Sequence, residues 1–280
     1  MAFECLLRFI NDRGETCYGN VPRGVDIASI VGKEVDALDG SPQAGFTSVN
    51  KQSVVKEVLC PIAEVHIFQC IGLNYRQHAK EAKATIAPYP VVFSKPPDAR
   101  AGPYDDVHVH RDAQSKLDYE GELTVIIGKD CKDVNEDDAL NHVLGYAVGN
   151  DISARNFQAK EVSGGQFGYA KSFDRFAPIG PVIVSPLVIK DPQNLEYTTK
   201  VNGELRQKTN TSDMIWSVRQ IIAHLSRGTT LRAGSAIMTG TPSGVALFME
   251  GGKGFLKHGD VVEIEVEEIG AIKNRIVFDA

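Results

Sequence analysis

The sequence predicts a mainly β protein of the α+β class, with a few short helices and a small β-unit at its N-terminus. Many of its apolar segments are short and rich in Val, Ile and Tyr, as is typical of strands. Clusters of Gly, Pro and Asp separate them, which suits turns between strands. A break near Cys60-Pro61 divides a small N-terminal domain, residues 1–63, from a larger domain, residues 64–280.

Strands are expected along the whole chain. Residues 3–10 and 17–21 flank the turn NDRGE and predict a hairpin. The segment VHIFQCIGLNY predicts a buried strand that runs into a loop. Further strands are expected at residues 90–95, 117–128, 143–150, 180–185, 195–203, 235–240 and 261–269.

Three segments have helical patterns. Residues 75–83 predict a short polar helix. Residues 136–143 predict another, with acidic residues in the first turn, where the helix dipole favours them. In residues 212–228, apolar side chains recur at helical spacing, Thr211 or Ser212 can cap the start, and a glycine can cap the end.

Composition excludes several classes of function. The chain has 30 basic and 36 acidic residues, a net charge of −6, spread without a basic stripe, so a nucleic-acid partner is not expected. No apolar run approaches the about 20 residues that span a bilayer, so no membrane association is expected. The N-terminus lacks signal-peptide features, and five cysteines without a CxxC pair predict reduced thiols in a cytoplasmic protein.

Two carboxylates lie close together in the predicted strand at residues 117–128. Successive side chains of a strand point to opposite faces, so Asp118, Glu120 and Glu122 share a face, the two glutamates ~6.6 Å apart along it. Burying them without a cation would raise their pKa values. A hard divalent ion such as Mg²⁺, Mn²⁺ or Ca²⁺ would remove the repulsion. The alternative is the solvated face of an amphipathic strand.

A third carboxylate and two cations follow in the chain. Asp151 comes after a predicted strand and opens a segment of helical character, where an aspartate is commonly a helix cap. The same junction places Arg155 and Gln158 on the first turns of the segment that follows. The Arg155 guanidinium could there hold a substrate carboxylate by two parallel hydrogen bonds. Lys171 stands between aromatic residues, either as a surface lysine or as an ammonium that stabilises developing negative charge.

His78 and Glu81 are the candidates for acid–base chemistry. At positions i and i+3 they share a face of the predicted helix. A carboxylate that orients an imidazole makes it a better general base. The alternative is a chance pairing on a polar helix.

The glycine-rich turn at residues 240–244 follows a predicted strand but lacks the lysine of a nucleotide-binding loop. Its N–H groups and the Thr241 hydroxyl suit a substrate carboxylate better than a phosphate. His108 and His110 alternate onto one strand face, but no further ligand stands at a suitable spacing, so we do not predict a metal site there.

Each motif is common alone, but their order along the chain is specific. The order is IGLNYRQHAKE, VVFSKP, LDYEGELTVIIG, GYAVGNDISARNFQ, AKSFD, VNGELRQ, MTGTPSGV and KHGDVVEIEVEEIG. Over residues 66–275 this order resembles the fumarylacetoacetate hydrolase family. The resemblance implies a mixed β-sandwich roll, a catalytic domain over residues 64–280, a homodimer, and a small-molecule 2-oxo acid or β-dicarbonyl substrate.

The resemblance also implies a cofactor and the residues that hold it. The cofactor would be Mg²⁺ or Mn²⁺, with Ca²⁺ as a substitute, bound by Glu120, Glu122 and Asp151. His78 and Glu81 would activate water, carried on a mobile segment that closes over the substrate.

Further residues would act on the substrate itself. Lys171 would stabilise the developing oxyanion. Arg155, Gln158 and Thr241 would contact the carboxylate and oxo groups, with Lys95 beside them. Where the family has Asp after the Arg of its SARD motif, this chain has Asn156 and so lacks one charge near the site.

The implied chemistry breaks a C–C bond in a 2-oxo acid and passes through an enolate. Acylpyruvate- or fumarylacetoacetate-type hydrolysis is the first expectation, because the H-x-x-E pair is intact. Oxaloacetate decarboxylation and keto–enol tautomerisation or isomerisation share the enolate. A non-catalytic binding module on the same scaffold is an alternative of another class, although every site position keeps a suitable side chain.

Overall fold

A computed structural model describes residues 2–280, and strands dominate it, which confirms the mainly β fold class. The largest sheet has 11 strands. Ten of them follow one another in the order β2 (Thr16–Val21), β3 (Glu34–Ser41), β4 (Gly45–Val58), β1 (Cys5–Asn11), β13 (Ala177–Val184), β11 (Val143–Asn150), β10 (Gly121–Ile127), β16 (Ala236–Met238), β5 (Phe68–Gly72) and β6 (Val91–Lys95), and β7 (Arg100–Ala101) pairs with β13.

Two smaller sheets and a set of short helices complete the architecture. The second sheet runs β15 (Glu204–Asn210), β14 (Glu196–Val201), β17 (Val261–Val266), β18 (Gly270–Phe278) and β8 (Val107–Val109). The third pairs β12 (Ser153–Ala154) with β9 (Leu117–Asp118). The helices are α1 (Arg76–Glu81), α2 (Arg155–Gln158), α3 (Lys160–Ser163), α4 (Gly168–Lys171) and α5 (Val218–Leu225).

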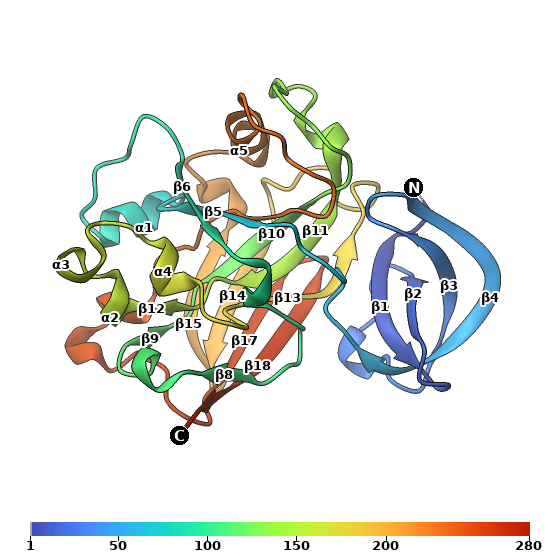
Figure 1. Ribbon diagram of the computed structural model, residues 1–280, viewed down its shortest axis with the longest axis horizontal. Helices are drawn as coiled ribbons and strands as arrows, with labels where there is room; N and C mark the ends of the chain where they lie inside the picture. The colour runs from blue at the N-terminus through green and yellow to red at the C-terminus, as the bar shows by residue number, and fades with distance from the viewer. Residues whose placement is uncertain (1) are drawn as a thin grey trace.

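The N-terminal strands β1 to β4 gather at one end of the molecule (Figure 1). The predicted hairpin is confirmed, since β1 and β2 pair as antiparallel neighbours. β1 also pairs with β13, with Leu6 opposite Ile183, so these strands continue the main sheet. The domain boundary at residue 63 stays a prediction.

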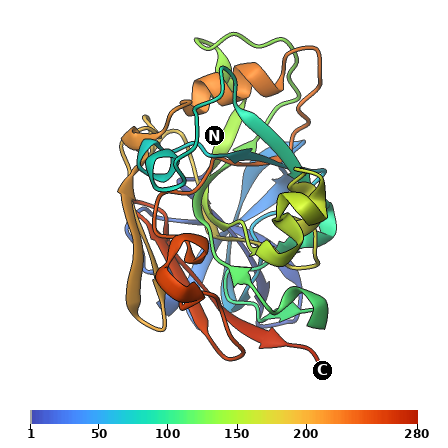
Figure 2. The same ribbon diagram turned by 90° about the vertical axis from the view of Figure 1, so that its left-hand side faces the viewer.

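The centre of the main sheet is fully buried. Every residue of β10, β11 and β13 is buried. A charged side chain on these strands must therefore find its partners inside the protein. Helices α1 to α4 lie at the end opposite β1–β4, near the ends of β10 and β11 (Figures 1 and 2). Within residues 2–280, no helix is both long enough and apolar enough to cross a membrane.

The single strand expected at residues 117–128 is instead two strands, β9 and β10, with a break at Tyr119 and Glu120. Side-chain amides take the place of strand partners there. The Glu120 N–H donates to Asn150 Oδ1 at 3.0 Å, and the Gly121 N–H donates to Gln207 Oε1 at 3.0 Å. The alternation of an unbroken strand therefore does not decide where Glu120 points.

The helix expected at residues 212–228 is shorter, because only α5 is helical beyond a single 3₁₀ turn. Its cap is Ser217, which forms a capping box with Gln220, in place of Thr211 or Ser212. Asn74 holds the residues just before α5 in a non-helical bend. Its side-chain oxygen accepts the Trp216 N–H at 2.8 Å.

Other boundaries also differ from the sequence-based prediction. The helix expected at residues 136–143 is a 3₁₀ turn over Ala139–His142. The helical character after Asp151 is confined to the short helices α2 and α3. The sequence predicts no strand where β15 and β18 lie. Their polar residues hide the alternation, since β15 reads ELRQKTN and β18 buries Asn274.

Candidate metal centre and active site

Three buried carboxylates converge at the end of the two central strands. Oxygen atoms of Glu120, Glu122 and Asp151 lie within 4.8 Å of one another, a cluster that could hold a metal ion. The pairing of β10 with β11 explains the convergence, because it sets Gly121 opposite Asn150. Residues that neighbour this pair along each strand are then brought to the same place.

Glu122 is the member of the cluster without a cation beside it. Its side chain is 1% exposed, and its Oε2 accepts the Gly240 N–H at 2.7 Å. Burial, together with the charges of Asp151 and Glu120, raises the pKa of Glu122 well above its usual range. This carboxylate is therefore the one that most needs a positive charge.

Glu120 has two cations in contact with it. Its oxygens accept from Lys171 Nζ at 2.8 Å and from Arg155 at 2.5 Å. Burial alone would raise the pKa of Glu120, but the charges of Lys171 and Arg155 outweigh it and hold that pKa below its usual range. Glu120 is thus an ionised ligand candidate.

Two buried lysines hold Asp151. Lys171 Nζ donates to Asp151 Oδ2 at 2.6 Å and lies 4.8 Å from the centre of the Phe93 ring. Lys95 Nζ donates to Asp151 Oδ1 at 2.6 Å and to the carbonyls of Ile152 and Phe176. With every donor of Lys95 directed to these partners, this lysine orients Asp151.

The donor set fits a hard divalent cation. Carboxylate oxygens are the ligands that such ions prefer. Four buried carboxylates, those of the cluster and Asp118, face the three cations Lys95, Arg155 and Lys171, which leaves one negative charge uncompensated. A buried uncompensated charge is costly, and a divalent ion would remove the deficit.

Arg155 is fixed by a residue that sequence reasoning did not single out. Asp118 Oδ2 accepts from Arg155 Nε at 2.8 Å, and its two oxygens also accept the N–H groups of Ala246 and Leu247. Arg155 also donates to Gln158 Oε1 at 2.7 Å. The only signal in the sequence was the place of Asp118 two residues before Glu120.

The side chains of His78 and Glu81, the candidates for acid–base chemistry, are in contact. His78 Nδ1 and Glu81 Oε2 are 2.9 Å apart on α1, and His78 is 8% exposed. Glu81 also accepts the Gly244 N–H at 3.0 Å, which ties α1 to the glycine-rich loop. Gly244 has a φ of +100°, and a Cβ there would lie 2.1 Å from the Arg206 carbonyl oxygen, so the loop requires glycine.

The glycine-rich loop has a structural role that the sequence did not suggest. Its N–H groups at Gly240 and Gly244 bind carboxylates of the protein itself. The Thr241 hydroxyl donates to the Gly121 carbonyl at 3.1 Å and accepts from Gln207 at 2.9 Å. Gln207, which also binds the Gly121 N–H, is a further site residue that was not expected.

Asn156 points away from the cluster. Its side-chain amide donates to the Asp112 carbonyl at 2.8 Å. The residue that departs from the family pattern is therefore used to fix a neighbouring loop.

A cavity of about 390 Å³ joins most of these groups. Its lining includes six of the residues predicted from the sequence, namely His78, Glu120, Arg155, Gln158, Lys171 and Thr241. Glu81, Glu122, Asp151 and Lys95 are not part of the lining. Glu81 contacts His78 and Asp151 contacts Lys171, both of which line it, and Glu122 binds the adjoining glycine-rich loop. Lys95 is one step further away, because it reaches the site through Asp151. We call this space the site cavity.

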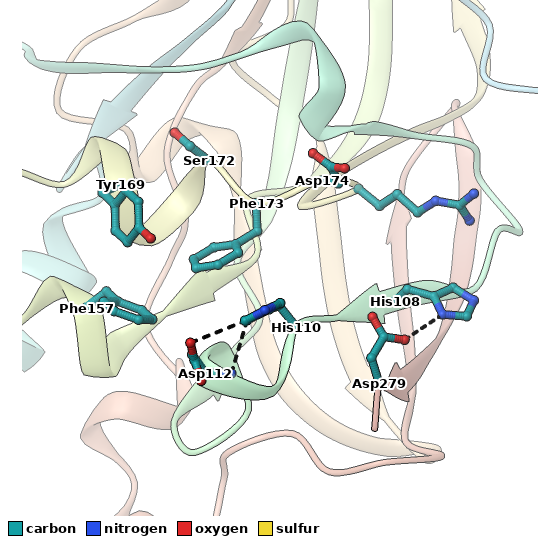
Figure 3. A pocket seen from close by; sticks show the side chains of 10 residues that line it. His108, His110, Asp112, Phe157, Tyr169, Ser172, Phe173, Asp174 and Asp279 are labelled. Atoms are coloured by element: carbon teal, nitrogen blue, oxygen red, sulfur yellow. Dashed lines mark hydrogen bonds and ion pairs between the residues drawn. The ribbon is translucent and has the colours of Figure 1, made fainter.

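A larger cavity, about 730 Å³, is lined by other residues. Figure 3 shows His108 and His110 there, each beside its own aspartate and separate from the other. His108 Nδ1 is 2.9 Å from Asp279 and His110 Nδ1 is 3.7 Å from Asp112. The two histidines therefore do not converge on one point. We call this space the outer cavity.

Comparison with known proteins identifies the family. The profile of "Fumarylacetoacetate (FAA) hydrolase C-terminal" matches residues 68–277. The chain belongs to the fumarylacetoacetate hydrolase family.

Members of this family are enzymes, and two similar sequences carry the same activity in their names. Oxaloacetate tautomerase YisK of Bacillus subtilis is 46% identical over 214 residues, 74% of this chain and 68% of the relative. The mitochondrial oxaloacetate tautomerase fahd2 of Xenopus laevis is 41% identical over 79% of this chain and 68% of the relative.

Solved structures of the family share the whole fold. A 2-hydroxyhepta-2,4-diene-1,7-dioate isomerase from Mycobacterium marinum has a TM-score of 0.83 and 32% identity over 99% of both chains. A fumarylacetoacetate hydrolase from Exiguobacterium antarcticum has a TM-score of 0.80 and 34% identity, covering 98% of this chain and 99% of that one. The N-terminal strands are therefore part of the architecture that these proteins share.

Proposed function

We propose that this protein is a metal-dependent tautomerase that interconverts the keto and enol forms of a 2-oxo diacid of the oxaloacetate type. The observation that carries the proposal is the site cavity, which His78 lines together with Glu120, Arg155 and Lys171. The names of relatives 46% and 41% identical favour tautomerisation over hydrolysis, which reverses the order expected from the sequence.

The proposed cofactor is Mg²⁺ or Mn²⁺, with Ca²⁺ as a substitute, held by Glu120, Glu122 and Asp151. These oxygen ligands suit such ions better than zinc. A divalent ion held there would supply Lewis acidity that stabilises negative charge on the oxo group of the substrate.

His78 is the proposed proton carrier. With Nδ1 bonded to Glu81, the other ring nitrogen is the one available to substrate. The imidazole removes a proton from the carbon beside the oxo group, the C–H electron pair forms the C=C bond, and the π pair of the C=O bond moves to the oxo oxygen. The imidazolium then gives the proton to that oxygen, which returns His78 to its neutral form. The reverse reaction returns the proton from His78 to carbon. Positioned acid–base groups of this kind typically contribute 10²- to 10⁴-fold in rate, as an order of magnitude.

The remaining residues bind and orient the substrate in this proposal. Lys171 stabilises the developing oxyanion. Arg155 and Gln158 bind the carboxylate beside the oxo group, and Thr241, which also lines the cavity, borders that carboxylate. Lys95 holds Asp151 in place by the hydrogen bond at 2.6 Å.

The test is the decay of the enol form of oxaloacetate, followed by ultraviolet absorbance with the Mg²⁺- or Mn²⁺-loaded protein. Acceleration above the spontaneous rate, lost with EDTA and restored by metal, is the expected result. A rate equal to that without protein would overturn the proposal. Full turnover after complete metal removal would overturn its metal dependence.

Hydrolysis of a C–C bond is the second candidate. It is favoured by the oriented His78–Glu81 pair, which can activate water as well as carry a proton, and by the name of the Exiguobacterium antarcticum relative. Assays on acetylpyruvate and fumarylacetoacetate test it. Carbon dioxide release from oxaloacetate tests decarboxylation, which shares the enolate, in the same sample.

We also propose a cytoplasmic homodimer. The family resemblance supports the homodimer, and the name of the Bacillus subtilis relative carries no organelle, whereas that of the Xenopus laevis relative is mitochondrial. The mass in solution by light scattering and cell fractionation test the two parts. A monomeric mass, or recovery in an organelle, would contradict them.

A further inference from the structure

Lys116 lines the site cavity together with Glu120, Arg155 and Lys171. It is exposed, whereas Arg155 and Lys171 are buried. Among residues 2–280, no carboxylate lies within ion-pair distance of the Lys116 ammonium, while Arg155 and Lys171 are each paired with two carboxylates. Of these three cations in the cavity lining, Lys116 is therefore the one whose charge no described carboxylate of the protein offsets.

The backbone fixes Lys116 relative to the rest of the site. Its carbonyl accepts the Arg155 N–H at 2.9 Å. The next two residues form β9, which pairs with β12, with Leu117 opposite Ala154. The base of the Lys116 side chain is thus held beside Arg155, and its four-carbon stem leaves the ammonium free to adjust to a ligand.

The charge of the site explains why a diacid needs this cation. The four buried carboxylates and three buried cations leave one negative charge, which a divalent ion converts into one positive charge. The carboxylate beside the oxo group of the substrate would neutralise it. The second carboxylate of the substrate, remote from the oxo group, has no counter-charge among the buried residues. In a cavity of about 390 Å³ this carboxylate would lie near the lining residues.

We propose that Lys116 binds the carboxylate remote from the oxo group and so makes the site selective for dicarboxylates. This assignment rests on the proposed function, because it requires a 2-oxo acid to occupy the site cavity. Lys116 is a specificity residue in this scheme and takes no part in proton transfer.

The experiment compares two substrates that differ in one charge, oxaloacetate and its 4-methyl ester, whose remote carboxylate is blocked. Lys116→Met is expected to raise KM for oxaloacetate about fivefold, as for a solvent-accessible ion pair, and to leave kcat within about twofold. KM for the ester should not change. Lys116→Arg should restore the KM for oxaloacetate. The charge-matched control is Lys51→Met on the exposed face of β4, which should alter neither substrate.

Equal effects of Lys116→Met on both substrates, or none on either, would overturn the assignment. If the wild-type protein turns over neither substrate, the proposed function fails by itself. Calorimetric binding of the two compounds to the Mn²⁺-loaded protein then decides the role of Lys116. Loss of affinity for the diacid alone would support it, and equal affinities of variant and wild type would overturn it.

Discussion

The site cavity and the outer cavity share two helices but hold their charges differently. α2 and α4 contribute Arg155 and Lys171 to the first, and Phe157 and Tyr169 to the second. In the first, the Lys171 and Asp151 side chains are 2% and 1% exposed, whereas the His108–Asp279 pair of the second is 51% and 49% exposed.

This difference in burial, and not cavity size, is why we place the proposed chemistry in the site cavity. The outer cavity is the larger one, at about 730 against 390 Å³. Exposed ion pairs contribute little and are easily replaced by water. Buried charges are costly unless their partners are held in place, so a dense buried cluster in a protein is a candidate for function.

The largest effect is expected from the carboxylate without a cation. Glu122→Gln should weaken Mn²⁺ binding by about 100-fold or more, since even outer partners of metal ligands cost 10–100-fold. Turnover should fall accordingly. Calorimetry with Mn²⁺ measures the affinity. The metal-free variant should be no less stable to urea, because Gln keeps an oxygen for the Gly240 N–H and brings no charge beside Asp151 and Glu120. Unchanged metal affinity would remove Glu122 from the ligand set.

Replacing the proton carrier should separate chemistry from metal binding. His78→Ala is expected to lower the rate of tautomerisation by about 10²- to 10⁴-fold. Mn²⁺ affinity should stay within about twofold, because the ring nitrogen of His78 is bonded to Glu81 and His78 is not one of the proposed metal ligands. Enol decay and Mn²⁺ titration of the same sample give both numbers. An undiminished rate would contradict the role of His78.

Substitutions of a buried lysine and of an exposed histidine compare the two cavities by their effects on the free energy of unfolding. Lys95→Met leaves Asp151 with one cation fewer in a buried site and should lower the free energy of unfolding by about 3–5 kcal/mol. His108→Ala, the matched change in the outer cavity, should alter it by less than about 1 kcal/mol. Urea unfolding of the metal-free proteins measures both. Similar losses for the two variants would show that burial does not separate the cavities.

The smallest effect is expected from the histidines of the outer cavity. His110→Ala combined with His108→Ala should leave metal content and kcat/KM within about twofold, since the two rings do not converge. Metal analysis and the enol assay check this. A loss of bound metal in the double variant would show that the outer cavity also binds a cation.

Several features follow from the sequence alone. The mainly β class, the hairpin of β1 and β2 and most strand positions come from the spacing of apolar residues and turn residues, which are local signals. The ordered motifs identified the family, and through it the three carboxylates that the structure brings within 4.8 Å of one another.

Only the tertiary structure decided how the site is held together. The strand ends before β10, where Tyr119 and Glu120 are not part of the ladder. Asp118 binds Arg155, and the Gly244 N–H binds Glu81. These contacts join residues that are distant in sequence. Only the structure shows that Arg155 and Lys171 are paired with carboxylates whereas Lys116 is not. Local patterns state what each side chain prefers, whereas burial and the positions of distant partners determine which charges remain available to a ligand.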